Sequence, residues 1–307
     1  MLQRISPRIL SSKCGNPGGW LNSVKVVLGF IEIALGLKFL STADQTYHWG
    51  LLDREVYLAV WIVTFSLLGF YLLGKIRFKH DDKVENIGVG RLALAIGVFA
   101  FVVYLIPGMW GAPLKGLSGY LPPITTQDFV LGQNGYRPSA QVVDSATGKT
   151  GDAPAPAGRK YSDFLKMPYG IPAFFDYNEA LEYAKAAGKP LFVDFTGHGC
   201  VNCREMEARV WSDPRVLKML KEDYVVCSLF ADDKKEVDEA DWVTLDNGRV
   251  LKSLGKINSH FAMTRFNVNA QPYYAILDPE TEEHKVPSRG YNLDVEEYVK
   301  FLTDGLK

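Results

Sequence analysis

The stretch Leu191-Phe-Val-Asp-Phe-Thr-Gly-His-Gly-Cys200-Val-Asn-Cys203 decides the fold of this chain. Its first five residues are mostly apolar and β-prone and stand between glycine-containing turns, which predicts a short buried strand. The residues that follow, 204–211, are rich in helix formers. Cys200 and Cys203 are therefore expected on a strand-to-helix turn and in the first helical turn.

A thiol at the start of a helix is more easily ionised, because the helix dipole and the unpaired backbone N–H groups stabilise negative charge there. Cys200 is accordingly predicted to be a nucleophile. Cys203 lies one helical turn later and can close a small disulfide ring with Cys200, so it is predicted to be the resolving thiol. The alternatives are a zinc site and a purely structural disulfide. The other cysteines, Cys14 and Cys227, stand alone in the sequence, so redox work is predicted, with no metal and no cofactor beyond this disulfide.

At these residues the chain resembles the thioredoxin superfamily, and more closely the C-terminal domain of the DsbD-type thiol:disulfide interchange proteins. The resemblance continues through Met206-Glu-Ala-Arg-Val-Trp-Ser-Asp-Pro214. It implies that Asp194, six residues before Cys200, is a buried acid that assists proton transfer from the resolving cysteine. It also implies that Pro272 is held in cis opposite the cysteine pair, since X–Pro is the peptide bond for which cis is cheap. The alternatives are a hydrogen-bonded strand-end aspartate and a trans proline that opens an edge strand.

The chain departs from many thioredoxins beside the cysteines. His198-Gly199 stands where a tryptophan is common, and Val201-Asn202 replaces Gly-Pro. Because those positions tune the reduction potential, the resemblance does not fix its value here. A protonated His198 would favour the thiolate of Cys200, and a plain surface histidine is the alternative.

Composition limits what the rest of the chain can be. Its 307 residues suffice for two units of ordinary size. A formal net charge of −1 argues against a nucleic-acid partner, because there is no basic excess to neutralise phosphates. Almost all the apolar runs precede Pro107, and almost all the acidic clusters follow Asp176.

Three hydrophobic segments predict transmembrane helices, at about residues 24–40, 56–74 and 92–107. The middle segment is uncharged and close to the length that crosses about 30 Å of hydrocarbon. None has a polar face, which argues against buried helices of a soluble domain. Glu32, inside the first segment, is expected to face protein or water, with proton or electron passage and a helix-to-helix hydrogen bond as the two alternatives.

Basic residues predict the orientation of these helices. Residues 1–25 contain four basic residues and no acid, and the loop between the second and third segments is also basic. By the positive-inside rule both flanks are cytoplasmic, and the C-terminal half lies on the far side, in the periplasm or its equivalent. The resemblance to DsbD-type proteins implies that this membrane is a bacterial inner membrane. A dithiol there needs a supply of electrons, because the compartment is kept oxidising.

The predicted fold class is an α/β thioredoxin-like domain, residues 173–307, after an all-α membrane region, residues 1–107. Residues 108–172, dense in Gly, Pro, Ser and Thr, predict a linker. The acidic run 232–241 is predicted to be a solvated loop face, since calcium-loop spacing is lacking. Strands are predicted at 191–195, 224–230, 273–277 and 284–286, and helices at 178–187, 204–211, 259–266 and 294–306.

The resemblance also reaches the membrane region, since residues 20–123 look like the last spans of DsbD-type proteins. In that family the membrane domain relays electrons from cytoplasmic thioredoxin through a pair of intramembrane cysteines. The predicted spans contain no cysteine. The chain is therefore expected to be the C-terminal fragment of a longer protein, or else to draw electrons from a separate membrane subunit.

The predicted function is membrane-anchored protein-disulfide reduction. Cys200 attacks a partner disulfide, Cys203 resolves the mixed disulfide, Asp194 handles the proton, and Pro272 shapes the surface for an extended substrate segment. The resemblance implies periplasmic disulfide proteins as substrates, such as apocytochrome c maturation factors or a disulfide isomerase. The alternative function is a membrane-tethered module whose C-x-x-C holds copper or zinc.

Overall fold

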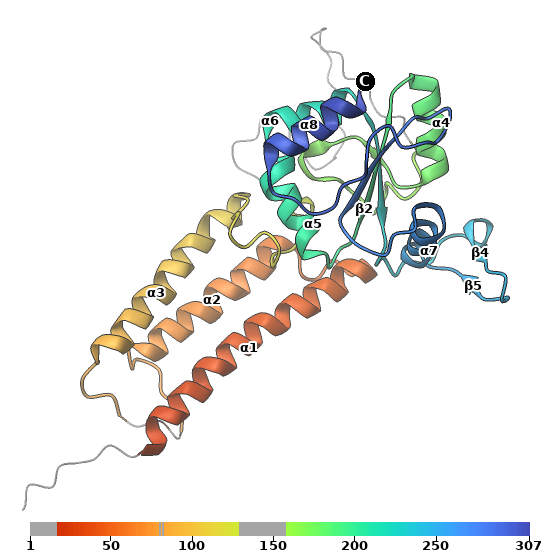
Figure 1. Ribbon diagram of the computed structural model, residues 1–307. Coiled ribbons are helices and arrows are strands. Elements are labelled where there is room, and N and C mark those ends of the chain that lie inside the picture. The colour runs from red at the N-terminus through yellow and green to blue at the C-terminus, as the bar shows by residue number, and fades with distance from the viewer. Residues whose placement is uncertain (1–16, 80, 82, 129–157) are drawn as a thin grey trace, which may run out of the picture. The chain divides into compact units, whose positions relative to one another are not determined.

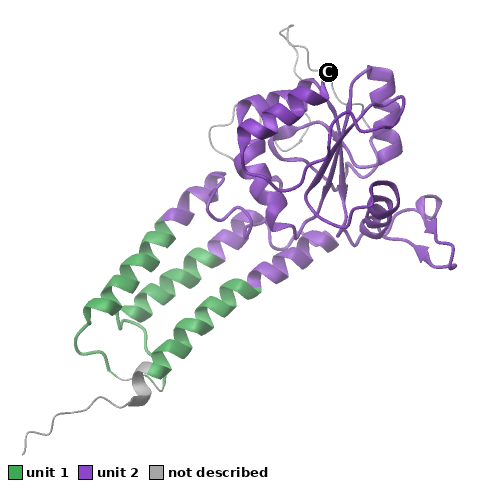
Figure 2. Cartoon of the chain, in the orientation of Figure 1, with its two compact units in different colours: residues 1–36, 61–103 green, residues 37–60, 104–307 purple. Residues whose placement is uncertain are grey.

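The computed structural model describes residues 17–79, 81, 83–128 and 158–307 (Figure 1). The chain divides into two compact units. Unit 1 draws on residues 1–36 and 61–103, and unit 2 on residues 37–60 and 104–307 (Figure 2). Cys14 lies outside the described residues. Unit 2 contains both cysteines of the C-x-x-C motif.

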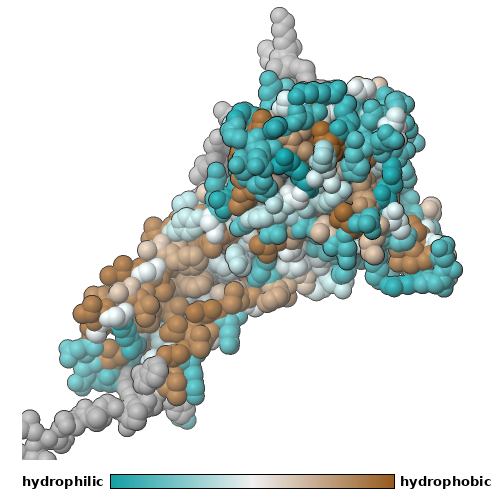
Figure 3. Space-filling model, in the orientation of Figure 1, coloured by the Kyte–Doolittle hydropathy of each residue, from teal (hydrophilic) through white to brown (hydrophobic). Residues whose placement is uncertain are grey.

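Three helices are long and apolar enough to cross a membrane: α1 (Pro17–Tyr47), α2 (Arg54–Leu72) and α3 (Val89–Leu105). Each covers most of one predicted hydrophobic segment, and α1 extends beyond its segment at both ends. Large apolar side chains such as Ile33 and Leu94 are exposed on them, and Figure 3 shows this surface in brown. Apolar surface of this extent is uncommon on soluble proteins and suits contact with lipid.

Packing and side-chain hydrogen bonds join the helices within unit 1. The indole Nε1 of Trp61 donates to the carbonyl oxygen of Ala34 at 3.1 Å, and the Arg91 guanidinium donates to carbonyl oxygens at the end of α2. The side chain of Glu32 is exposed on α1. Within the described residues it is therefore not buried against another helix, the setting that the predicted helix-to-helix hydrogen bond would need. One buried cluster of this unit comprises Leu68, Tyr71, Leu72 and Ala95.

A four-stranded sheet forms the centre of the C-terminal part of unit 2. Its strands run in the order β1 (Ala173–Phe174), β3 (Val225–Phe230), β2 (Leu191–Thr196) and β6 (Tyr273–Leu277). The first three are parallel and β6 is antiparallel to β2. Every residue of β2 and β3 is buried, as expected for central strands that are covered on both faces.

Helices cover both faces of this sheet (Figure 1). Because side chains alternate along a strand, Phe192 of β2 packs into one cluster and Val193 into another. The first cluster is closed by α5 (Val201–Met206) with its continuation Glu207–Trp211, by α6 (Pro214–Glu222) and by α8 (Val295–Gly305), and the second by α4 (Tyr177–Ala187) and α7 (Leu254–Phe266). The predicted α/β thioredoxin-like fold is confirmed.

Several predicted boundaries differ from the structure. Residues 284–286 form only an isolated bridge, between Leu277 and His284, so the predicted strand is wrong. Pro287 follows directly and has no N–H to continue a ladder. Helix α7 begins at Leu254, five residues before the predicted start at 259, because Ser253 ends the preceding extended segment. The structure adds α6, β1 and a hairpin of β4 (Val243–Thr244) and β5 (Val250–Leu251), none of which was predicted.

The described ends of the predicted linker are packed. Residues 129–157 lie outside the described residues. In 108–128, Leu121 is buried and the Gln127 amide donates to the Gly108 carbonyl oxygen at 3.0 Å. In 158–172, three apolar residues enter the core beside the sheet. They are Leu165, Met167 and Ile171.

Candidate active site

The two cysteines lie where β2 passes into α5. Cys200 is the N-cap residue of α5, and its Sγ accepts a hydrogen bond from the backbone N–H of Cys203 at 3.1 Å. A disulfide joins the two residues, with their Cα atoms 5.3 Å apart. Cys203 is 2% exposed, whereas Cys200 is partly exposed. Cys200 is therefore the more accessible of the two cysteines.

A shallow groove runs past Cys200. It has a volume of about 320 Å³. The peptide bond between Gln271 and Pro272 is cis, as the resemblance implied, and Gln271, but not Pro272, is among the residues that line the groove. Gly197 lies against this side of the groove, since a Cβ there would lie 2.5 Å from the Gln271 Oε1. The lining residues are Cys200, Val201, Asn202, Asn269, Ala270 and Gln271.

Two carboxyl groups are buried on the sheet side of α5. Asp194 of β2 is 2% exposed and accepts a hydrogen bond from the Ser228 hydroxyl at 2.8 Å. Glu207 is 8% exposed and pairs with the Arg204 guanidinium at 2.8 Å. It follows Cys203 by four residues, so both project from one face of the helix.

Burial sets the protonation of both acids. Burial, aided by the negative charge of Glu207, raises the pKa of Asp194 to about 7. Burial likewise raises the pKa of Glu207 to about 7, although the Arg204 charge opposes it. The pair therefore titrates near neutral pH, where an acid can both accept and release a proton. Sequence reasoning identified Asp194 and missed Glu207, whose signal was the Arg-x-x-Glu spacing directly after Cys203.

Asp232 holds the loop that leads into Cys200. Its Oδ1 accepts the backbone N–H of His198 and its Oδ2 that of Gly199, both at 2.8 Å. This contact follows from the sheet, because β2 and β3 are parallel and Thr196 pairs with Phe230. The segments after the two strands must then lie side by side. The prediction that residues 232–241 form a solvated face is wrong for Asp232 and Asp233.

His198 is buried, so the surface alternative for it is wrong. Its side chain is 8% exposed, and its Nε2 lies 2.9 Å from the Asp233 Oδ2. The Nε2 of His48, from the segment after α1, lies 2.8 Å from the same oxygen. Burial would raise the pKa of Asp233, but hydrogen bonds from His198, His48 and the Lys235 amide lower it to about 2. Sequence reasoning did not identify His48 or Asp233.

Residues of the N-terminal half of unit 2 cover one side of the active-site loop. A Cβ at Gly199 would lie 2.8 Å from the Thr42 Cγ2, and a Cβ at Gly119 would lie 2.5 Å from the Val201 Cγ1. These short distances show that Thr42 and Gly119 pack directly beside the cysteine motif.

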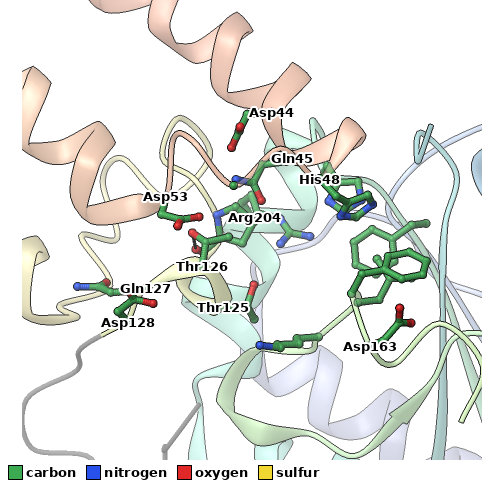
Figure 4. Close-up of a pocket in the computed structure, with 17 residues that line it drawn as sticks. Asp44, Gln45, His48, Asp53, Thr125, Thr126, Gln127, Asp128, Asp163 and Arg204 are labelled. Carbon is green, nitrogen blue, oxygen red and sulfur yellow. Dashed lines mark hydrogen bonds between the residues drawn. The ribbon is translucent and has the colours of Figure 1, made fainter. Parts of the chain in front are cut away.

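A polar cavity of about 330 Å³ lies next to this covered side. Figure 4 shows His48, Asp44, Asp53 and Arg204 among the side chains around it. Among the described residues, His48, His198 and Asp233 form a group whose potential ligand atoms lie within 4.8 Å of one another, and the group includes neither cysteine of the C-x-x-C motif. Cys227, as expected, is a free and buried thiol whose pKa is raised by burial.

Comparisons with known proteins agree with this architecture. A thioredoxin-like family model matches residues 173–279. A thiol:disulfide interchange protein, DsbD 2 of Pseudomonas aeruginosa, is 30% identical over 207 residues, which is 67% of this chain and 28% of that protein. The thiol:disulfide interchange protein DsbD of Pseudoalteromonas atlantica is 25% identical over 66% of this chain and 26% of its own length. The chain thus spans little more than a quarter of these relatives.

A solved structure described as DsbH oxidoreductase matches 46% of this chain and 92% of its own, with 19% identity and a TM-score of 0.34. The matches to thiol:disulfide interchange proteins and to the thioredoxin-like model together confirm the resemblance stated from the sequence. The family model places a thioredoxin-like domain in the C-terminal part of the chain. Three helices that are apolar enough for a membrane precede it in the sequence.

Proposed function

We propose that this chain is a membrane-anchored thiol:disulfide oxidoreductase that reduces disulfide bonds in periplasmic proteins. One observation carries the proposal: a partly exposed cysteine at the start of α5 is disulfide-bonded to a buried cysteine one turn later, beside an open groove. Because the domain is thioredoxin-like and its relatives are thiol:disulfide interchange proteins, disulfide exchange is the chemistry that the site supports best.

The first half of the reaction uses the exposed sulfur. In the reduced dithiol, the Cys200 thiolate attacks one sulfur of the partner's disulfide. A bond forms between Cys200 and that sulfur, and the partner's other sulfur leaves as a thiolate and takes up a proton. The groove lined by Asn269, Ala270 and Gln271 would hold the extended substrate segment, with Pro272 fixing the backbone on that side.

The second half uses the buried sulfur. The Cys203 thiol gives its proton to the carboxylate pair of Asp194 and Glu207, whose pKa values of about 7 suit this transfer. The Cys203 thiolate then attacks the Cys200 sulfur, which releases the partner as its second thiol. Two electrons have passed from the dithiol to the partner, and the Cys200–Cys203 disulfide is the oxidised product.

A new cycle requires a reductant for this disulfide. We assign that task to an upstream membrane relay, as a domain or a separate subunit, with cytoplasmic thioredoxin as the ultimate donor. The three apolar helices would anchor the chain in the lipid bilayer of a bacterial inner membrane, and the basic flanks of those helices favour a periplasmic position for the thioredoxin-like domain.

A trapping experiment tests this function. The full-length Cys203→Ser variant should accumulate mixed disulfides with its acceptors in bacterial cells, because the resolving thiol is missing. Non-reducing gels and mass spectrometry of the purified adducts would identify a bond to Cys200. The Cys200→Ser variant is the matched control and should trap nothing. If both variants trap nothing, the chain does not act by this mechanism.

A further inference from the structure

We propose that His48, His198 and Asp233 form a binding site for one divalent transition-metal ion, with Zn²⁺ as the best match. The side-chain cluster lies in unit 2 and uses neither cysteine of the redox motif. The inference is independent of the proposed disulfide exchange, since metal binding can be measured while the Cys200–Cys203 disulfide is intact.

The three side chains converge although their positions in the sequence are far apart. His48 follows the end of α1, His198 precedes Cys200, and Asp233 follows β3. The two Nε2 atoms lie 2.8 and 2.9 Å from the same Asp233 Oδ2. One ligand atom from each residue lies within 4.8 Å of the others. Two imidazole nitrogens and one carboxylate oxygen are a donor set typical of zinc sites.

Backbone hydrogen bonds hold this arrangement in place. The Asp233 Oδ1 accepts the backbone N–H of Lys235 at 2.8 Å, which leaves Oδ2 directed toward both imidazoles. The carbonyl oxygen of Thr46, at the end of α1, accepts the backbone N–H of Lys234 at 2.9 Å. In metal sites the ligand side chains are typically held by hydrogen bonds to neighbouring groups.

Close packing of α7 fixes the Asp233 backbone as well. The backbone N–H of Gly255 donates to the Asp233 carbonyl oxygen at 3.1 Å. A Cβ at this glycine would lie 2.5 Å from both the backbone nitrogen and the carbonyl oxygen of Asp233. These contacts hold the Asp233 backbone in place independently of His48 and His198.

The site can accept a metal ion and a water molecule after a small outward movement of the imidazoles. Neighbouring ligand atoms on a tetrahedral zinc ion lie roughly 3.3 Å apart, given bond lengths of about 2.0–2.2 Å. Each imidazole would need to move outward by about half an ångström. His48 has that freedom, because its side chain is 19% exposed and borders the polar cavity of about 330 Å³. Water in the cavity can supply the fourth ligand.

The donor set also selects the class of ion. Calcium and magnesium prefer oxygen ligands throughout, and Cu(I) prefers sulfur. Two imidazoles with one carboxylate suit zinc and its neighbours cobalt, nickel and iron. A bound ion would hold the loop before Cys200 to the end of α1 through His198 and His48.

Cobalt titration of the full-length chain in detergent tests the proposal. The protein is kept oxidised, so that no thiolate is available, and Co²⁺ is used as a spectroscopic substitute for Zn²⁺. We expect one equivalent of Co²⁺ to bind, with visible absorption bands of nitrogen and oxygen ligation and without a thiolate charge-transfer band. Added Zn²⁺ should displace the Co²⁺.

Two variants separate metal binding from simple hydrogen bonding. A His48→Gln side chain can still donate a hydrogen bond to Asp233, yet it is a poor zinc ligand. We expect Co²⁺ affinity to fall at least about tenfold, because loss of even a group that only hydrogen-bonds to a ligand lowers metal affinity 10- to 100-fold. Asp233→Asn should weaken binding at least as much. His260→Ala, on α7 outside the cluster, is the matched control and should bind like the unaltered chain.

Three outcomes would overturn the proposal. One is that oxidised protein binds no Co²⁺. Another is that the His48→Gln variant binds Co²⁺ as tightly as the His260→Ala control. The third is that binding appears only after reduction and with a thiolate charge-transfer band, which would place the ion on Cys200 and Cys203. Thermal unfolding of each variant shows whether a loss of binding is a loss of folding.

Discussion

Two pairs of carboxyl groups flank the cysteine motif, and they behave in opposite ways. Asp194 and Glu207 lie on the sheet side of α5, where burial raises the pKa of each to about 7. Asp232 and Asp233 lie on the loop side and accept hydrogen bonds from backbone amides and imidazoles. The first pair has few partners and is suited to proton transfer. The second pair is saturated with donors and is suited to fixing the loop before Cys200.

The largest expected effect comes from neutralising the sheet-side pair. In an Asp194→Asn, Glu207→Gln double variant, resolution of the mixed disulfide by Cys203 should slow by about 10²-fold, because general-base assistance is lost. The initial attack by Cys200 should change little. Quenched-flow mass spectrometry of the mixed disulfide measures the two steps separately. Asp246→Asn, an exposed acid on the hairpin loop, is the control. An unchanged resolution rate would contradict a proton-transfer role for the pair.

A smaller effect is expected from the loop-side pair. Asp232→Ala removes the acceptor of two backbone N–H groups, and loss of bonds to a charged group should lower the free energy of unfolding by about 2–3 kcal/mol. Because this residue does not take part in proton transfer, the resolution rate should stay within about threefold of the original. Thermal unfolding measures the loss of stability, and the quenched-flow assay on the same sample measures the rate at which Cys203 resolves the mixed disulfide. If this rate falls strongly while stability is unchanged, Asp232 takes part in proton transfer and the division between the two pairs is wrong.

The smallest expected effect is a difference between the two pairs in how their contribution to the free energy of unfolding changes with pH. The pKa values of Asp194 and Glu207 rise from 3.8 and 4.5 to about 7 on folding. The folded state then binds more protons than the unfolded state, so their contribution to stability falls as the pH rises from about 4 to about 7. The pKa of Asp233 falls from 3.8 to about 2. Its contribution is therefore complete above about pH 4 and is lost as the pH falls toward 2.

Thermal unfolding across this pH range provides the measurement. The Asp194→Asn, Glu207→Gln double variant should lose the decline between pH 4 and 7 and keep the loss at lower pH. Asp233→Asn should do the reverse. If the double variant retains the full decline above pH 4, groups other than these two acids cause it.

Local sequence signals predicted the parts of the site that depend on one segment. The apolar run before the glycines predicted β2, and the two-residue spacing placed Cys200 at the N-cap and Cys203 inside the helix. The family resemblance supplied Asp194 and the cis bond before Pro272. Each of these conclusions needed only neighbouring residues or a motif with a fixed position.

The rest of the site depends on contacts between distant segments. In the sequence, Asp232 is one residue of an acidic loop. Its contact with the segment before Cys200 arises only because β2 and β3 are parallel neighbours, so that the segments after the two strands lie together. His48 stands 185 positions before Asp233, so nothing nearby in the sequence relates the two residues. Glu207 lay within reach of local reasoning, because it follows Cys203 by one helical turn.

Alkylation of the reduced full-length chain tests the central claim most directly. In the proposed mechanism Cys200 is the accessible nucleophile and Cys203 is its buried partner, 2% exposed. Brief treatment with iodoacetamide at neutral pH, followed by mass spectrometry, should therefore show Cys200 modified at least about tenfold faster than Cys203. Equal rates, or faster modification of Cys203, would contradict the assignment of nucleophile and resolving thiol.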